Sequence, residues 1–233
     1  MTNEQHIWEG LLQRIGNPYG TAAVMGNLMA ESSLSPICVT GLSKTGYETV
    51  SQYVIASDDG VHDFSNDGVA FGLAQWYFHT RKQGLWEFAK KRCASVGDLE
   101  TQLAYICQEM SIHYKTVWQA VTGATEIKAA SDLVMLKYEK PANTGEAAKN
   151  RREYYAQKFF DSYATAVGPM VYITDKNVNM RVGNGMTYAS ASHAQKGDYY
   201  QWIATAKNGW HAIRVKSLNR VLWVHPDFSE LRG

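Results

Sequence analysis

The feature that most constrains the fold is a change of hydrophobic period at Gly168-Pro169. Before this point, apolar residues recur at three- and four-residue spacing, as at Val24, Leu28 and their neighbours, which is typical of amphipathic helices. After it, short runs alternate between apolar and polar residues and are separated by Gly/Asn turns. The 233 residues therefore predict two domains: a mainly helical one over residues 1–166 and a small all-β barrel over residues 170–233.

Helix caps and prolines locate the helices of the first part. Asn17-Pro18 predicts a helix that runs to about residue 32, because asparagine caps a helix and proline fits its first turn. Asp98 is the expected cap of another, and Thr80 of a third. Further helices are expected over residues 47–56, 127–138 and 145–165. In the second part, strands are expected over residues 178–182, 199–206, 210–215 and 221–225, with a short joint at residues 166–169.

Charge and cysteine content exclude several classes of protein. The net charge is +1, and no dense basic stripe of the kind that binds nucleic acid is present. No apolar run approaches the ~18 residues of a membrane span. The three cysteines cannot form a closed disulfide set, which favours a reducing compartment. The first six residues contain neither a basic leader nor an apolar run, so we expect synthesis in the cytoplasm.

The two parts differ in charge. Residues 1–168 contain 15 basic and 18 acidic side chains, whereas residues 169–233 contain 8 and 4. This difference is consistent with different partners for the two parts, or with a small β domain that contains few acids. Motifs for nucleotide phosphates and clusters of metal ligands are missing from the sequence. We therefore expect no cofactor and no metal.

Glu31 is a carboxylic acid in an unusual place, because it follows an apolar run at the C-terminal end of a predicted helix. The helix dipole is negative at that end, and neighbours such as Leu28 and Leu34 reduce solvation, so both effects favour the protonated form. A carboxyl group that keeps its proton near neutral pH suits general-acid cleavage of a glycosidic bond. A solvated glutamate at a helix end is the alternative interpretation of this feature alone.

A second segment combines flexibility, an amide and flat rings: Ala70-Phe71-Gly72-Leu73-Ala74-Gln75-Trp76-Tyr77. Glycine permits a sharp turn or a close approach to a ligand. Gln75 can donate and accept hydrogen bonds, and Trp76 and Tyr77 offer faces on which sugar rings can stack. The same composition is also compatible with a buried strand.

Together, the segments 26–32 and 71–76 resemble the tail-associated lysozymes and endolysins of bacteriophages, within the lysozyme-like superfamily. Tyr138-Glu139-Lys140-Pro141 and Arg151-Arg152 also look like that family, and the resemblance spans roughly residues 5–165. It implies a lysozyme-like domain that cleaves the glycan strands of bacterial peptidoglycan. The family's catalytic acid falls on Glu31. The resemblance leaves the second carboxylate open between Asp67 and Glu48, and it implies substrate contacts at Phe71, Gln75, Trp76, Tyr77 and Tyr138.

The C-terminal part resembles bacterial SH3-type domains through Val178-Asn179-Met180-Arg181-Val182-Gly183-Asn184-Gly185, although Asn184 stands where proline is usual. Such domains in lysins bind the cell wall. The resemblance therefore makes aromatic residues of this part candidate wall contacts, although they can equally fill the barrel: Tyr199, Tyr200, Trp202 and Trp210.

We therefore expect a monomeric peptidoglycan hydrolase that cuts the β-1,4 bond between N-acetylmuramic acid and N-acetylglucosamine and that reaches the wall after release from the host cytoplasm. A lytic transglycosylase or a glucosaminidase, acting on the same polymer, is an alternative enzyme. A wall-binding or phage structural protein without activity is an alternative from another class.

Overall fold

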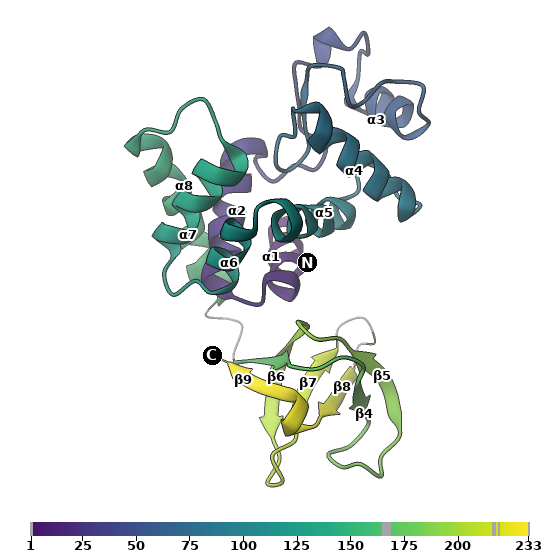
Figure 1. The fold of residues 1–233 in the computed structure, drawn as a ribbon, viewed down its shortest axis with the longest axis vertical. Helices are drawn as coiled ribbons and strands as arrows, with labels where there is room; N and C mark the ends of the chain where they lie inside the picture. The colour runs from purple at the N-terminus through teal and green to yellow at the C-terminus, as the bar shows by residue number, and fades with distance from the viewer. Residues whose placement is uncertain (1, 165–168, 216–217, 219, 233) are drawn as a thin grey trace.

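The computed structural model describes residues 2–164, 169–215, 218 and 220–232, and it consists of an N-terminal helical domain and a C-terminal β-sheet region (Figure 1). Part of the predicted joint, residues 166–168, lies outside the described residues. Among the helices of the described chain, none is long and apolar enough to cross a membrane. The helices of the first part are α1 (Asn3–Ile15), α2 (Pro18–Ser32), α3 (Val50–Asp58), α4 (His79–Lys91), α5 (Leu99–His113), α6 (Lys115–Thr122), α7 (Ile127–Leu133) and α8 (Glu146–Phe159).

Two of the predicted helix caps are confirmed. The backbone N–H of Gly20 donates to Asn17 Oδ1 at 3.1 Å, and that of Thr101 donates to an Asp98 carboxylate oxygen at 2.8 Å. Thr80 is not a cap, because it lies inside α4. This helix begins at His79, and Phe78 is its N-cap residue. The sequence analysis did not locate α1 and α6. The helices α7 and α8 continue as π-helical turns over Val134–Glu139 and Phe160–Ala164.

Helix α2 lies at the centre of the domain and is buried on most sides. A helix that is apolar all round packs inside a protein rather than on its surface. Its neighbours are α1, α6, α7 and α8. The approach of α8 is closest at Gly26, where an added Cβ would lie 2.6 Å from the backbone oxygen of Arg152 and 2.7 Å from Ala156 Cβ. A larger residue at Gly26 would therefore push α8 away.

The C-terminal region is one seven-stranded antiparallel sheet, whose strand order is β5-β4-β8-β7-β6-β3-β9. The strands β5 and β9 stand at the two ends of this order and do not pair with each other, so the predicted closed barrel is wrong. The strands are β3 (Met170–Ile173), β4 (Val178–Arg181), β5 (Ser190–Ala194), β6 (Tyr199–Thr205), β7 (His211–Val215), β8 (Arg220–Val224) and β9 (Ser229–Arg232).

Buried and exposed residues alternate along these strands, and the buried ones form a hydrophobic core separate from that of the helical domain. On β4, Val178 and Met180 are buried, whereas Asn179 between them is exposed. Leu222 and Val224 on β8 contribute in the same way, because successive side chains of a strand point to opposite faces. This core shares no residues with that of the helical domain, which is consistent with the two periods in the sequence.

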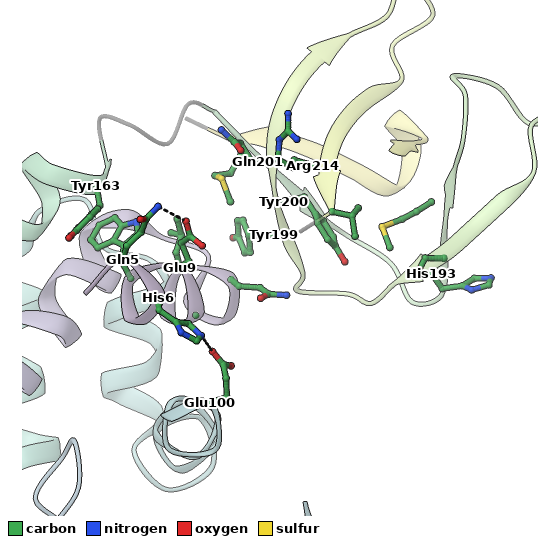
Figure 2. Close-up of a pocket in the computed structure, with 18 residues that line it drawn as sticks. Gln5, His6, Glu9, Glu100, Tyr163, His193, Tyr199, Tyr200, Gln201 and Arg214 are labelled. Carbon is green, nitrogen blue, oxygen red and sulfur yellow. Dashed lines mark hydrogen bonds and ion pairs between the residues drawn. The ribbon is translucent and has the colours of Figure 1, made fainter. Parts of the chain in front are cut away.

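The two parts meet where α1 faces the strand β6 (Figure 2). The ring of Tyr199 covers Gly16, at which an added Cβ would lie 1.7 Å from the ring. Gly16 ends α1 with φ +71°, a conformation that glycine adopts without strain. Beside this contact, a cavity of about 640 Å³ is lined from both sides, with His6 and Glu100 on one side and Tyr200 and Arg214 on the other.

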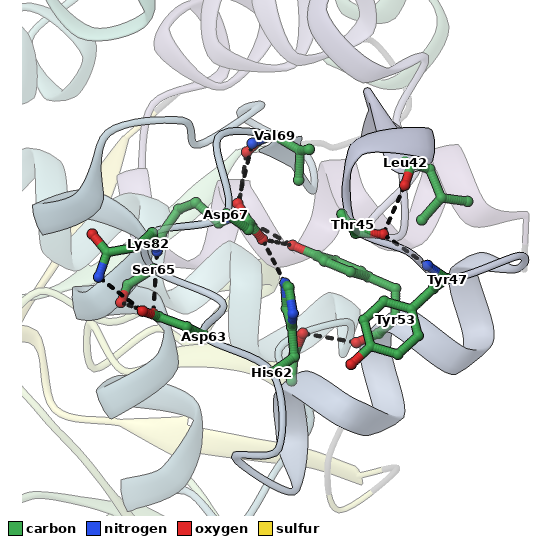
Figure 3. Close-up of polar contacts among 12 residues, drawn as sticks. Leu42, Thr45, Tyr47, Tyr53, His62, Asp63, Ser65, Asp67, Val69 and Lys82 are labelled. Carbon is green, nitrogen blue, oxygen red and sulfur yellow. Dashed lines mark hydrogen bonds and ion pairs between the residues drawn. The ribbon is translucent and has the colours of Figure 1, made fainter.

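The helices α3 and α4 form a second lobe of the helical domain (Figure 1) with a two-stranded sheet, in which β1 (Val39–Thr40) pairs with β2 (Ala70–Phe71). A buried polar cluster around Asp67 connects its elements (Figure 3). One carboxylate oxygen accepts from Lys82 Nζ at 2.5 Å and from the N–H of Val69 at 3.1 Å. The other accepts from Tyr53 Oη at 2.6 Å and lies 3.1 Å from His62 Nε2.

This cluster keeps a lysine inside the domain, because the Lys82 side chain is fully buried. Burial alone would raise the pKa of Asp67, but the hydrogen bonds from Lys82 and Tyr53 outweigh it and hold that pKa below its ordinary value. A carboxyl whose pKa is lowered in the folded state stabilises the protein above its unfolded pKa, near 4. This contribution is lost as the pH falls through the folded value.

We predict that Asp67→Asn lowers the free energy of unfolding by about 3–5 kcal/mol, because it leaves the Lys82 ammonium buried without its carboxylate. Urea denaturation at pH 7 measures this loss. The same experiment near pH 3 should show a smaller difference between the variant and the parent protein. Asp59→Asn is the matched control, since Asp59 is exposed at the end of α3 and is not part of the cluster around Asp67. An equal loss from both substitutions would contradict the structural role of Asp67.

Candidate active site

Glu31 lies in the last turn of α2, with 18 % of its side chain exposed. The guanidinium of Arg152, from α8, forms a short ion pair with its carboxylate. Arg152 also donates to the backbone oxygen of Ala148 at 3.2 Å, which fixes its direction. The apolar surroundings expected from the sequence are therefore incomplete, because a buried cation stands beside Glu31.

The close contact of α2 with α8 produces this pairing. Because Gly26 has no side chain, the backbone of α8 approaches at the residue that carries the guanidinium. Arg152, Ala156 and Phe159 share the buried side of α8, at spacings of four and three residues. This helical period was the available sign that Arg152 points inward. The sequence analysis noted Arg151-Arg152 only as part of a family motif.

A second buried ion pair lies nearby, between Arg81 of α4 and Glu109 of α5. Arg81 Nε and Nη2 donate to the two carboxylate oxygens at 2.7 and 2.9 Å, a bidentate geometry that is strong and directional. Glu109 also accepts from Trp76 Nε1 at 3.0 Å and from Tyr138 Oη at 2.8 Å. No motif in the sequence pointed to this pair.

Glu139 ends the π-helical turn that follows α7. Its Oε1 is buried and has no hydrogen-bond partner among the residues that the structure describes. Burial raises the pKa of Glu139 well above its ordinary value. The cation of Arg81 opposes this shift, the anions of Glu31 and Glu109 add to it, and the cation of Arg152 opposes it. The surroundings of Glu139 therefore favour its protonated form.

The two candidates for a second carboxylate lie in different settings. Both oxygens of Asp67 already accept two hydrogen bonds each within the buried cluster, which fills the capacity of a carboxylate. Asp67 therefore has no free lone pair with which to orient a water molecule. Glu48 is exposed, directly before the cap of α3.

Most of the predicted sugar contacts are structural residues. Phe71, Trp76 and Tyr138 are fully buried, so their rings cannot stack on a sugar in this structure. The side-chain amide of Gln75 donates to the backbone oxygens of Cys38 and Gly72, and accepts from Thr40. Tyr77 remains available because it is 53 % exposed.

Phe78, which was not predicted as a contact, is 65 % exposed beside Tyr77. Their ring centroids lie 6.0 Å apart, in an edge-to-face arrangement. The chain thus presents two adjacent rings directly after the buried Trp76, and flat apolar faces of this kind can pack against sugar rings.

The four aromatic residues of the sheet that were expected to contact the cell wall differ in their burial. Tyr199 is buried at the contact with α1, and Tyr200 lines the cavity at the same junction (Figure 2). Trp202 is half-buried against the sheet core, and its Nε1 donates to Thr205. Trp210 is mostly buried but lines a small surface pocket of about 150 Å³, together with Arg181, His225 and Phe228.

In the described part of the chain, no group of three or more His, Cys, Asp or Glu side chains could hold a metal ion.

Comparison with known proteins assigns the helical domain. The family model described as "Phage tail lysozyme" matches residues 2–163, which is most of the chain and the whole described helical domain. This match ends before the sheet region, and the chain matches none of the curated proteins with which it was compared. Because the match covers residues 2–163, the chain belongs to the phage tail lysozyme family.

Proposed function

We propose that the protein is a peptidoglycan hydrolase that cleaves the β-1,4 bond between N-acetylmuramic acid and N-acetylglucosamine. The family implies a lysozyme-type glycoside hydrolase. The observation that carries the proposal is a partly exposed carboxyl group, Glu31, that a buried arginine fixes inside the matched domain. In this reaction Glu31 donates a proton to the bridging oxygen as the bond to the sugar C1 breaks.

Rigid placement is the main contribution of the protein to such a reaction. Proton transfer requires heavy atoms within about 2.6–3.2 Å, so a general acid must be held in position. Arg152 holds Glu31, and the packing at Gly26 holds Arg152. The adjacent rings of Tyr77 and Phe78 are our candidates for sugar contacts.

We further propose that the sheet region attaches the enzyme to the wall. Residues 169–233 carry 8 basic and 4 acidic side chains, which suits an anionic polymer. The pocket lined by Trp210, Arg181, His225 and Phe228 combines aromatic rings with a cation. Attachment raises the effective concentration of glycan near the catalytic domain. The enzyme would act on the wall after release from the cell that makes it.

We predict that Glu31→Gln lowers the rate of wall lysis at least about a hundredfold, because the amide keeps the shape but has no proton to transfer. Turbidity clearing of purified walls measures the rate, and circular dichroism tests that the fold persists. Glu126→Gln is the control, since Glu126 is exposed and its side chain caps nothing. If the Glu31 variant keeps a tenth or more of the activity, Glu31 is not the general acid.

Fragment analysis of digested peptidoglycan distinguishes the possible reactions. We expect muramic acid at the new reducing ends. Glucosamine there would indicate a glucosaminidase, and an anhydro end that lacks one water would indicate a transglycosylase. A protein that sediments with walls but releases no fragments would be a binder without activity, which would refute the proposed hydrolysis.

For the sheet region, we predict that Phe228→Ala weakens binding of the full chain to purified walls about tenfold, an effect of roughly 1.4 kcal/mol. Phe228 is 39 % exposed at the pocket rim. Co-sedimentation measures the binding, and cleavage of soluble glycan fragments should not change. Ile203→Ala is the control, since Ile203 is 37 % exposed but lies outside the pocket. Equal binding by both variants would exclude the pocket as the wall contact.

A further inference from the structure

The cavity at the junction of the two parts has oppositely charged sides. Its helical side, from α1 and α5, contains the carboxylates of Glu9 and Glu100. Its sheet side, from β6 and β7, contains the amide of Gln201 and the guanidinium of Arg214, which are cross-strand partners. Figure 2 shows the side chains of the two parts around this cavity. Its volume of about 640 Å³ is usual for a small-ligand site, and such sites often form at domain interfaces.

The carboxylates of the helical side are held in place. Glu100 accepts from Arg14 Nη2 at 2.9 Å and lies 2.7 Å from His6 Nε2, while 41 % of its side chain stays exposed. Glu9 accepts from the side-chain amide of Gln5, one turn earlier on α1, at 3.3 Å. With histidine counted as neutral, these two carboxylates outnumber the one arginine. This side of the cavity is therefore net negative.

The cation of the sheet side has no partner of its own. Arg214 is exposed, and within the described residues no hydrogen bond or ion pair reaches its guanidinium. By contrast, Arg232 on β9 donates to Glu230 at 2.7 Å and to Tyr199 at 2.9 Å. Arg214 therefore offers unused donors beside the cavity, in the fork geometry that suits a carboxylate.

The charges of the two sides select a class of ligand. A polyanion would pair with Arg214 but would be repelled by Glu9 and Glu100, and a polycation would meet the reverse arrangement. A neutral sugar would leave the charges of both sides unused. A molecule with a carboxylate at one end and an ammonium group at the other complements both. The rings of Tyr163 and Tyr200, which also line the cavity, add flat surface for the apolar parts of such a molecule.

We propose that this cavity binds a short zwitterionic peptide, with its carboxylate on Arg214 and its ammonium group on the side of Glu9 and Glu100. Peptidoglycan carries peptides with both kinds of charged group, so the natural ligand is a peptide of the wall. This assignment of the source rests on the proposed function, whereas the binding itself does not. The bound peptide connects the two parts of the chain beyond the contact of Tyr199 with Gly16.

Tetraalanine is the probe, since its only charges are the terminal ammonium and carboxylate groups. N-acetyltetraalanine amide is the matched control, because it has the same length and the same side chains but no charge. NMR titration of the full chain measures both affinities. We expect tetraalanine to bind at least about tenfold more tightly, because hydrogen bonds between charged groups are stronger than those between neutral ones.

Two substitutions assign the ends of the peptide. Arg214→Gln should weaken the binding of tetraalanine about tenfold and leave that of tetraalanine amide, which has no carboxylate, unchanged. Glu9→Gln should weaken the binding of tetraalanine but not that of N-acetyltetraalanine, which has no ammonium group. Arg220→Gln and Glu126→Gln are the matched controls, since both residues are exposed and lie outside the lining of the cavity.

Three results would overturn the inference: equal affinity for the charged and the blocked peptide, equal effects of Arg214→Gln and Arg220→Gln on tetraalanine, or tighter binding of the neutral glycan chitotetraose. These measurements need no catalysis, so they are independent of the proposed function. Normal wall lysis without tetraalanine binding would remove only the peptide site. An active Glu31→Gln variant that binds tetraalanine would remove only the proposed hydrolysis.

Discussion

The contact of α2 with α8 at Gly26 is the constraint on which the site depends. It brings the backbone of α8 against α2 and thereby directs Arg152 to Glu31, which lies 121 positions earlier in the chain. A side chain at Gly26 would separate the helices and loosen this ion pair. The geometry of the proposed acid is thus a consequence of helix packing and not of a flexible loop, which suits a group that must be held within a fraction of an ångström.

The domain contains two kinds of buried carboxyl group, and their environments explain different roles. Asp67 accepts four hydrogen bonds, and its charge is matched by Lys82, so it stabilises the second lobe. Glu139 has a buried oxygen without a partner and lies beside like charges. A saturated carboxylate has no lone pair left for a further hydrogen bond, whereas the surroundings of Glu139 favour its neutral form.

The two parts of the chain are stabilised independently but touch. Each has its own apolar core, and Tyr199 and Gly16 form a close contact between them. This contact and the cavity beside it occupy Tyr199 and Tyr200, two of the aromatic residues that the sequence offered for wall binding. The pocket at Trp210 has a separate lining on the sheet and is not part of this contact.

Local physics in the sequence determined the order of a helical part and a strand part, the start of α2 after Asn17, the start of α5 after Asp98 and the position of Glu31, because caps, prolines and hydrophobic period act over a few residues. The sequence could not show which aromatic rings are exposed. Trp76 and Tyr138 were expected to contact the sugar, but both side chains are buried. It also could not find the partner of Glu31. Arg152 reaches it from α8, and only the packing of α8 against α2 brought this ion pair together.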